Sequence, residues 1–317
     1  NDSLFFPNNE IRIRSSKDVS VVDINTFSES SQYGAKLSAS VNNLKDGILV
    51  HFNPSSLVFN EKTWNIEKDG EVLISKAKFD ASNFRLTNGE QSIGLITLPP
   101  AAGREQTIIL TLDKVNLGEL LPFVLKEPRI QGITSGDLTI EDPFNNLKLY
   151  LNAQTDKTRF ENDSIGMTSI NAFWDSKEKR ASYFLESDNP NYQFGVKGKL
   201  DLKDSSQQQI DTDIDVVNVK LSLLQPYLGI VFSQMDGFGN GKLRISGNLK
   251  EPDFTGAVKV SNAKVTVAYT QCSYTLADPV IEFSPGKINL GTIQLKDANG
   301  NQATVKGSLD HHFFRDF

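Results

Sequence analysis

The sequence of 317 residues is poor in the side chains that bind metals, form disulfides or build catalytic triads. Cys272 is its one cysteine, so an internal disulfide is excluded. The histidines are His51, His311 and His312, and the adjacent pair would point to opposite faces of an extended chain, which does not suit joint chelation of a metal. A metal site and a Ser-His-Asp triad are therefore poorly supplied, although a pair of carboxylates from distant positions stays open. We expect no metal, no cofactor and a protein that is not an enzyme.

Long apolar runs and clustered positive charge are also missing. The longest apolar stretches, such as 93–98 and 227–232, are far shorter than the roughly 18 residues of a membrane-spanning helix. The formal net charge of −6 argues against a nucleic-acid partner, because such a surface needs clustered Lys and Arg. The chain starts at Asn1 without a leader-like pattern and stops at Phe317 directly after a strand-like stretch. We interpret it as an excerpt of a longer protein, with any membrane anchor outside it.

Alternation of apolar and polar residues dominates the sequence. It is clear over 35–41, 147–153 and 192–202, and it is typical of strands with one buried face. Turn residues such as Lys68-Asp69-Gly70 and Ser284-Pro285-Gly286 separate these runs. The pattern predicts roughly twenty strands, mostly of five to eight residues, paired antiparallel through short links.

One sequence pattern occurs twice, about a hundred residues apart. Its first copy spans 115–140 and its second 217–245, and each contains an apolar strand end, a Leu-rich stretch with a Pro, several glycines and a new alternating strand. We expect the glycines to form a turn. Such a repeat favours a stacked architecture, with one continuous structure over 1–317. Its expected units are approximately 1–114, 115–216 and 217–317.

Two helices are expected inside these copies, at about 117–126 and 221–234. Pro122 and Pro226 lie within them, so each helix is expected to be kinked or to begin at its Pro. Capping and filling of a β core is the simple interpretation of both helices, and gating of a channel is the alternative.

A large sheet with one apolar face cannot leave that face in water. Stacked sandwiches and a sheet curled into a trough both solve the problem, and the repeat favours the trough. The predicted fold class is therefore all-β: an elongated, strongly curved, mostly antiparallel sheet that forms a groove, with two short helices. Alternation assigns the following residues to an apolar, lipid-binding face: Leu138, Ile140, Leu243, Ile245, Val258, Val260, Val265, Val267, Ile288, Leu290, Val305 and Leu309.

Three further motifs are interpreted as structural. Asp211, Asp213 and Asp215 resemble the start of a calcium loop, but the Gly and Glu that should follow are absent, so the acids are expected on the wet face of a strand. The glycines of 237–241 lack the Lys-Ser or Lys-Thr of a phosphate-binding loop. The two tryptophans, at 64 and 174, are expected to pack in the core.

The last third of the chain resembles the conserved C-terminal region of the TamB family (translocation and assembly module subunit), within the AsmA-like superfamily. The segments that carry this resemblance are GKLRISGNL at 241–249, Pro252, FTGAVKV at 254–260, NAKV at 262–265, YTL at 274–276, Asp278-Pro279, DANGN at 297–301 and ATVKGSL at 303–309. Upstream, WNI at 64–66, NFRL at 83–86 and NGEQSI at 88–93 are similar to segments of Bacteroidetes-type members.

The resemblance implies a curved, taco-like sheet in the periplasm, with an inner-membrane anchor outside this excerpt. It implies phospholipid or fatty acyl chains as cargo between the inner and outer membranes, in support of outer-membrane biogenesis. It also implies an outer-membrane barrel of the TamA or BamA type as partner, and it assigns no catalytic residues.

Two other functions stay open at this point. A chaperone-like scaffold would offer strand edges to outer-membrane proteins by β-augmentation. An extracellular sandwich that binds carbohydrate would need a surface platform of aromatic side chains. The chain contains only two tryptophans, which argues against such a platform.

Overall fold

Strands account for nearly all of the regular structure. The computed structural model describes residues 8–28, 34–59, 61–67, 69–75, 78–100, 106–123 and 128–310. Two compact units divide the chain: the first comprises residues 1–127 and 132–153, and the second comprises 128–131 and 154–317. The described residues contain 23 strands, and every strand pairing given below is antiparallel. The prediction of an all-β, antiparallel fold with two short helices is confirmed.

In the first unit, a meander of strands divides in two at β3. Its strands are β1 (Asn8–Ser16), β2 (Val19–Phe27), β3 (Gly34–Leu44), β4 (Gly47–Phe52), β5 (Ser55–Phe59), β6 (Lys62–Ile66), β7 (Glu71–Ser75), β8 (Phe79–Ser82), β9 (Phe84–Asn88), β10 (Gln91–Leu98), β11 (Thr107–Asn116) and β12 (Ile130–Glu141), followed by the start of β13 (Lys148–Phe160). One half of β3 pairs with β4 and leads to β7 and β8. The other half pairs with β5 and leads through β6, β9, β10 and β11 to β12.

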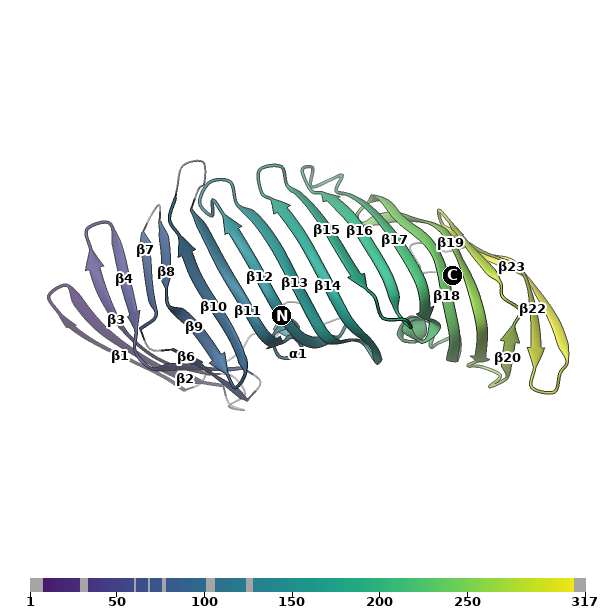
Figure 1. Cartoon of the computed structure of the whole chain (residues 1–317), viewed down its shortest axis with the longest axis horizontal. Coiled ribbons are helices and arrows are strands. Elements are labelled where there is room, and N and C mark those ends of the chain that lie inside the picture. The colour runs from purple at the N-terminus through teal and green to yellow at the C-terminus, as the bar shows by residue number, and fades with distance from the viewer. Residues whose placement is uncertain are drawn as a thin grey trace. The chain divides into compact units, whose positions relative to one another are not determined.

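In the second unit, a regular meander ends in a similar division (Figure 1). Its strands are β14 (Asp163–Asp175), β15 (Arg180–Ser187), β16 (Gln193–Asp201), β17 (Gln209–Lys220), β18 (Phe232–Asn248), β19 (Glu251–Val267), β20 (Ser273–Leu276), β21 (Val280–Ser284), β22 (Lys287–Asp297) and β23 (Gln302–Asp310). The end of β19 pairs with β20 and its middle pairs with β21, and both of these strands pair with β22. Several strands are longer than predicted, and β18 and β19 have 17 residues each.

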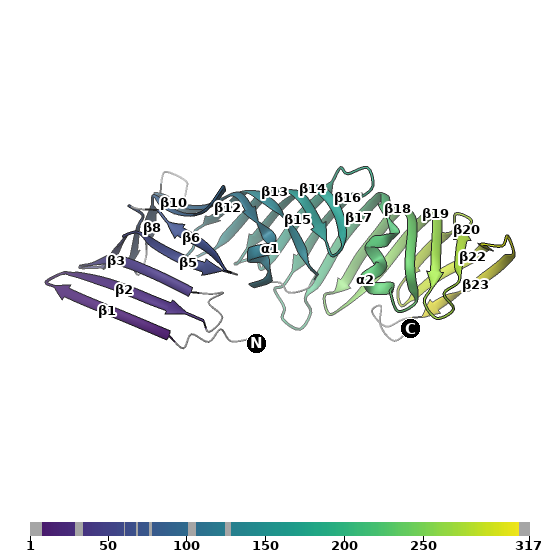
Figure 2. The ribbon, with the colours of Figure 1, turned by 90° about the horizontal axis from the view of Figure 1, so that it is seen from below.

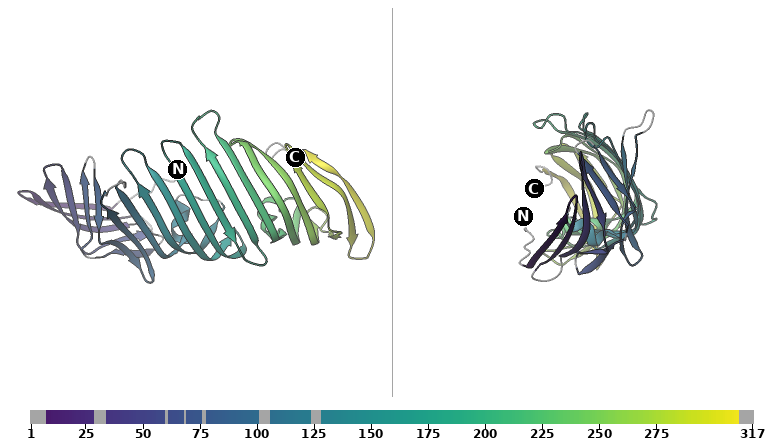
Figure 3. Two further views of the ribbon diagram at one scale, coloured as in Figure 1. Left: turned by 45° about the horizontal axis from the view of Figure 1, so that its top comes forward. Right: turned by 90° about the vertical axis from the view of Figure 1, so that its left-hand side faces the viewer.

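Bulges interrupt long strands at equivalent places in the two sequence copies. The β11–β12 register shifts between Leu112 and Val115, and the β17–β18 register shifts between Val216 and Val219. The extra residues, Lys114 and Asn218, have φ values of 51° and 52°. An extra residue bends a strand, and Figure 3 shows such bending in the long strands.

The described part of the first predicted helix is helical, and the second predicted helix is shorter than expected. The first consists of α1 (Leu117–Leu120) and the 3-10 helix η1 (Leu121–Phe123), and the last part of its predicted range lies outside the described residues. The second consists of the 3-10 helix η2 (Leu221–Leu224) and α2 (Gln225–Leu228). It does not reach residue 234, because Phe232 already pairs with Val267 in the sheet.

The repeated glycines lie inside strands and do not form the predicted turn. Gly132 and Gly136 belong to β12, and the glycines of 237–241 belong to β18. A Cβ atom on Gly241 would lie 2.1 Å from the carbonyl oxygen of Ala257. These positions therefore allow a close approach of neighbouring backbones at the bulged part of the sheet.

Among the residues that the structure describes, few large side chains are completely buried. In the first unit Trp64 is 1% exposed, as predicted for a packed tryptophan, while Trp174 in the second is only half-buried. The second unit has a cluster formed by Leu221, Met235, Val260 and Ala263. Leu221 comes from η2, so this cluster joins the helical segment to β18 and β19.

Candidate functional site

The most extensive feature of the second unit is one apolar row that crosses nine strands. Partner residues in an antiparallel pair have their side chains on the same face of the sheet. The strand registers give the row, in spatial order, as Ile170, Leu185, Val196, Ile214, Leu243, Gly256, Phe283, Ile288 and Leu309. At about 4.8 Å between strands, this row is roughly 40 Å long.

Parallel rows widen this apolar strip on both sides. One contains Ala172, Tyr183, Gly198, Thr212, Ile245 and Phe254, and the other contains Phe194, Val216, Gly241, Val258 and Ile281. We call these three rows the apolar face. Most of their side chains are half-buried, and Leu309 is 45% exposed. A face that reaches this size without full burial is typical of a binding surface.

The opposite face of the same strands is polar and charged. Arg244 lies 2.8 Å from an oxygen of Asp211, and Lys242 lies 3.0 Å from an oxygen of Asp215. Asp213 is also exposed, with Arg244 3.9 Å away. The three aspartates thus lie on the wet face of a strand, as predicted.

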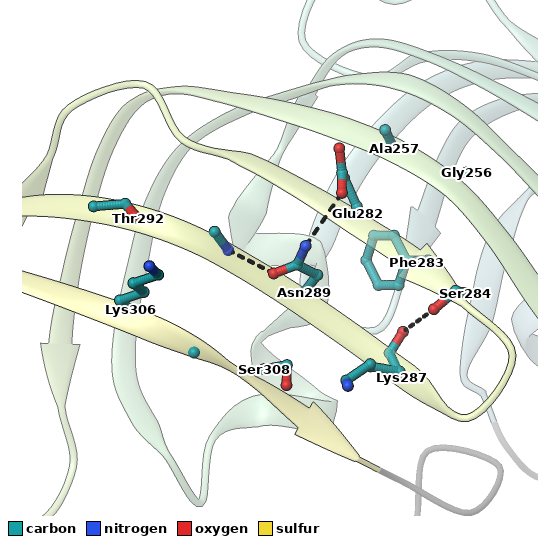
Figure 4. A pocket seen from close by; sticks show the side chains of 12 residues that line it. Gly256, Ala257, Glu282, Phe283, Ser284, Lys287, Asn289, Thr292, Lys306 and Ser308 are labelled. Carbon is teal, nitrogen blue, oxygen red and sulfur yellow. Dashed lines mark hydrogen bonds between the residues drawn. The ribbon is translucent and has the colours of Figure 1, made fainter.

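A hollow of about 720 Å³ lies between β19 and β23 on this polar side (Figure 4). Ala257, Glu282, Asn289 and Ser308 form the register row behind it. The Asn289 amide donates to Glu282 at 3.2 Å, and the Asn289 side-chain oxygen accepts from a backbone amide at 3.0 Å. Because Lys287 and Lys306 also line it, this hollow is a solvated, charged surface.

The helical segment η2–α2 covers one end of the second unit's apolar side (Figure 2). Leu221 and Leu228 pack there with Val258, Val260 and Ile281. Val260 is therefore only 8% exposed and belongs to a local core. Val265 is buried to the same extent.

Polar contacts hold this segment from a distant part of the chain. The Ser222 hydroxyl donates to an Asp163 carboxylate oxygen at 2.7 Å, and the Tyr192 hydroxyl donates to the same oxygen at 2.5 Å. The Lys220 ammonium lies 5.7 Å from the centre of the Tyr192 ring. Burial, and then the hydrogen bond to Asp163, raise the pKa of Tyr192 to about 12.

The first unit has an apolar face of its own. One row contains Phe84, Leu95, Leu110 and Leu138, and a neighbouring row contains Thr97, Ile108 and Ile140. The Phe84 ring also meets Phe52 edge to face, with ring centres 5.3 Å apart. The predicted residues Leu138 and Ile140 thus lie on one face with other apolar side chains.

Half of the residues that the sequence assigned to a lipid-binding face in the second unit also lie together. Leu243, Ile245, Val258, Ile288 and Leu309 belong to the apolar face. Three others lie at its margins: Val305 pairs with Ile293, Val267 pairs with Phe232, and Leu290 lies at the β22 bulge between Asn289 and Gly291.

Six of the nine members of the long row are not among the residues predicted from the sequence. They are Ile170, Leu185, Val196, Ile214, Gly256 and Phe283. Alternation around Val196 and Ile214 was a usable signal. Only the strand registers, however, could join these residues to Leu243.

Metal-binding groups and membrane-spanning helices are not found in the part of the chain that the structure describes. No set of three His, Cys, Asp or Glu side chains there could hold a metal ion. His311 and His312 lie outside the described residues. No helix in the described ranges is long and apolar enough to cross a membrane.

These observations define a class of protein: an all-β protein with long antiparallel strands and broad apolar faces that its own side chains leave half-exposed. A family model described as "TamB, N-terminal domain" matches residues 31–260, about three quarters of the chain. The chain belongs to the TamB family, whose members are cell-envelope proteins. No curated protein matches the chain, and neither does any solved structure. The assignments to the C-terminal region and to a Bacteroidetes-type member stay predictions.

Proposed function

We propose that this chain is a periplasmic, lipid-binding segment of a TamB-like protein. It holds acyl chains of phospholipids along the apolar face and supports their passage between the inner and outer membranes. In this proposal the chain is not an enzyme. An inner-membrane anchor lies outside the chain, and a barrel of the TamA or BamA type is its partner at the outer membrane.

The apolar face of the second unit carries this proposal. Its central row offers apolar contacts on nine neighbouring strands, from Ile170 to Leu309, with one glycine among them. Each methylene that leaves water contributes roughly 0.8 kcal/mol, so an acyl chain along the row needs no polar group for affinity. The same feature predicts little selectivity between acyl chains.

A pair of register-matched double variants tests the proposal. Ile214 and Leu243 face each other on the apolar side, and Asp213 and Arg244 face each other on the polar side of the same two strands. We expect Ile214→Asn with Leu243→Asn to reduce photocrosslinking of a diazirine-bearing phospholipid several-fold. Asp213→Asn with Arg244→Asn, the control, should leave it unchanged.

Circular dichroism of both variants would verify that the strands persist. Equal crosslinking of both folded variants would contradict the proposal. Val258 and Val260 are less suitable targets, because Val260 packs beneath η2 and its replacement would disturb the local core.

One observation favours a second function, a scaffold that pairs with strands of outer-membrane proteins. All nine residues of β23 are exposed, and Lys306 and Asp310 are among them. An exposed edge strand is a template for β-augmentation. Site-specific crosslinkers along β23 should then capture protein clients, while the chain purifies without bound lipid.

A further inference from the structure

Two segments of the second unit contain no charged residue. They span 221–235 and 265–277, 28 residues in all, in a chain of which 23% is Lys, Arg, Asp or Glu. A stretch of average composition and this combined length would contain about six charges. Leu221, Met235 and Val265 in these segments are buried, so core packing accounts for part of the missing charge. The exposed side chains of the same segments need a different explanation.

The sheet brings the two segments side by side. Phe232 pairs with Val267, and the Ala268 amide donates to the Val231 carbonyl at 2.8 Å. Ile230 and Tyr269 therefore lie next to each other, just beyond the ends of β18 and β19. They are 92% and 97% exposed.

Two more exposed apolar side chains flank this pair. Val231 lies in the turn directly before β18, and Leu224 precedes α2. The Gln225 side chain donates to the Phe232 carbonyl at 2.7 Å, which ties the helical segment to the strand. We call Leu224, Ile230, Val231 and Tyr269 the neutral tip.

The tip has an ordered support. The Gln271 amide donates to the Val267 carbonyl at 2.8 Å, and the Val231 amide donates to the Leu228 carbonyl at 2.9 Å. The exposed side chains are thus presented by closed turns, so binding orders little new backbone.

Within β18 and β19, the charged residues closest in sequence to the tip lie several residues inside the strands. Asp236 and Lys264 are register partners, several residues from the ends of β18 and β19. On β22, Lys296 and Asp297 pair with residues of β20. Each of these two places has one charge of each sign.

We propose that the neutral tip docks on the surface of a phospholipid bilayer. An exposed Tyr among aliphatic side chains is a composition that favours the boundary between headgroups and acyl chains. Four side chains are too few for a stable protein interface, which typically involves about 20–30 residues on each side. Insertion of a few apolar side chains into a bilayer has no such requirement.

Docking at this place would bring the apolar face close to a source of acyl chains. Phe232 and Val258 both pack against the cluster beneath η2, and Val258 belongs to the apolar face. This consequence depends on the proposed function, whereas the docking itself does not.

Cys272 is a suitable site for a fluorescent label. It is the only cysteine of the sequence, it is exposed, and it lies in the turn that holds Tyr269. The 317-residue chain, labelled there with an environment-sensitive fluorophore, is titrated with vesicles of pure phosphatidylcholine. We expect a blue shift that persists at high salt. Ile230→Ser with Tyr269→Ser should weaken vesicle binding at least tenfold.

The matched control is Val217→Ser with Val280→Ser, which removes two half-exposed apolar side chains elsewhere in the same unit. This control should bind vesicles like the unaltered chain. Absence of vesicle binding, or equal binding by the tip variant, would overturn the inference. A shift that depends on protein concentration without vesicles would also overturn it, because a second copy would then be the occupant.

Photocrosslinking of a detergent-dispersed fatty acid separates this inference from the proposed function. A tip variant that loses vesicle binding but keeps this crosslink supports docking and leaves the apolar face intact. If the Ile214 and Leu243 variant loses the crosslink but keeps vesicle binding, the apolar face binds acyl chains and docking does not depend on it.

Discussion

The two sequence copies build the same junction and secure it differently. In each copy a bulged strand leads into a short helix, and a glycine-containing strand returns beside it. At the first bulge the Lys114 amide donates to the Ser135 hydroxyl at 3.0 Å. At the second the Asn218 amide donates to the Asn240 side-chain oxygen at 2.9 Å. The repeat thus specifies the bulge and the partner that satisfies it.

A side-chain cap and a contact from the nearby strand β10 hold the first helix. The Asn116 side chain caps α1 by accepting from the Gly118 amide at 3.0 Å, and Gln91 accepts from the Asn116 amide at 2.7 Å. No residue of α1 is buried. The second helical segment has no side-chain cap and relies on distant Asp163 and on the buried Leu221. The comparison teaches that the repeat fixes the path of the chain, while each unit supplies its own anchor.

The largest effect is expected at the glycines that both junctions share. A side chain on Gly241 would meet the backbone of Ala257, and one on Gly136 would meet a backbone oxygen at 2.3 Å. We expect Gly241→Val and Gly136→Val each to lower the free energy of unfolding by about 3 kcal/mol or more. Urea denaturation measures this.

Gly195 is the control, because no atom lies within 4 Å of a Cβ placed there. Gly195→Val should change stability little. If Gly241→Val unfolds at the same urea concentration as this control, the shared close approach is not a requirement of the fold.

Removal of the distant anchor should have the next largest effect. Asp163→Ala leaves the buried Tyr192 hydroxyl and the Ser222 hydroxyl without their acceptor. Loss of a charged acceptor for buried groups costs about 2–3 kcal/mol. Hydrogen exchange should become faster in η2 and α2, whereas the exposed Asp156 changed to Ala should leave it unaltered. Unchanged exchange in the Asp163 variant would show that apolar packing alone holds the segment.

A pH titration sharpens the same contrast with a smaller effect. The pKa of Tyr192 is raised from 10.0 to about 12 in the folded chain. Its contribution to stability is therefore complete below pH 10 and is lost as the pH rises toward 12. We expect the free energy of unfolding to fall more steeply over this interval in the unaltered chain than in Tyr192→Phe. Parallel pH profiles of the two proteins would contradict the assignment.

The smallest effect is expected from the local cap of the first junction. Asn116→Ala removes the acceptor for the Gly118 amide and should cost about 1 kcal/mol. Asn116→Asp keeps an acceptor and should recover most of the loss. If thermal unfolding shows that Asn116→Ala lowers stability as much as Asp163→Ala, the two anchors do not differ in strength.

Alternation was sufficient to predict the strands and much of the apolar side. Leu243 lies two residues after Gly241, and Gly241 pairs with Val258, so Leu243 and Val258 lie on the same face of the sheet. Asp211 and Asp213 lie on the other face. The three sequence units and the single continuous domain stay predictions.

The helix limits and the role of the glycines could not be obtained in this way. Val231 and Phe232 suit the apolar side of a helix as well as a strand, and only the pairing with Val267 decided between them. The glycines suit a turn or a strand, and the approach of a neighbouring backbone decided that choice.

The amino-acid sequence by itself determined which side chains avoid water, since that depends on the local period of each strand. The tertiary structure alone decided which of them meet across strands, where bulges shift the register, and which, like Val260, are covered by a helical segment. Those features depend on partners far away in the chain, and a local pattern contains no information about its partner.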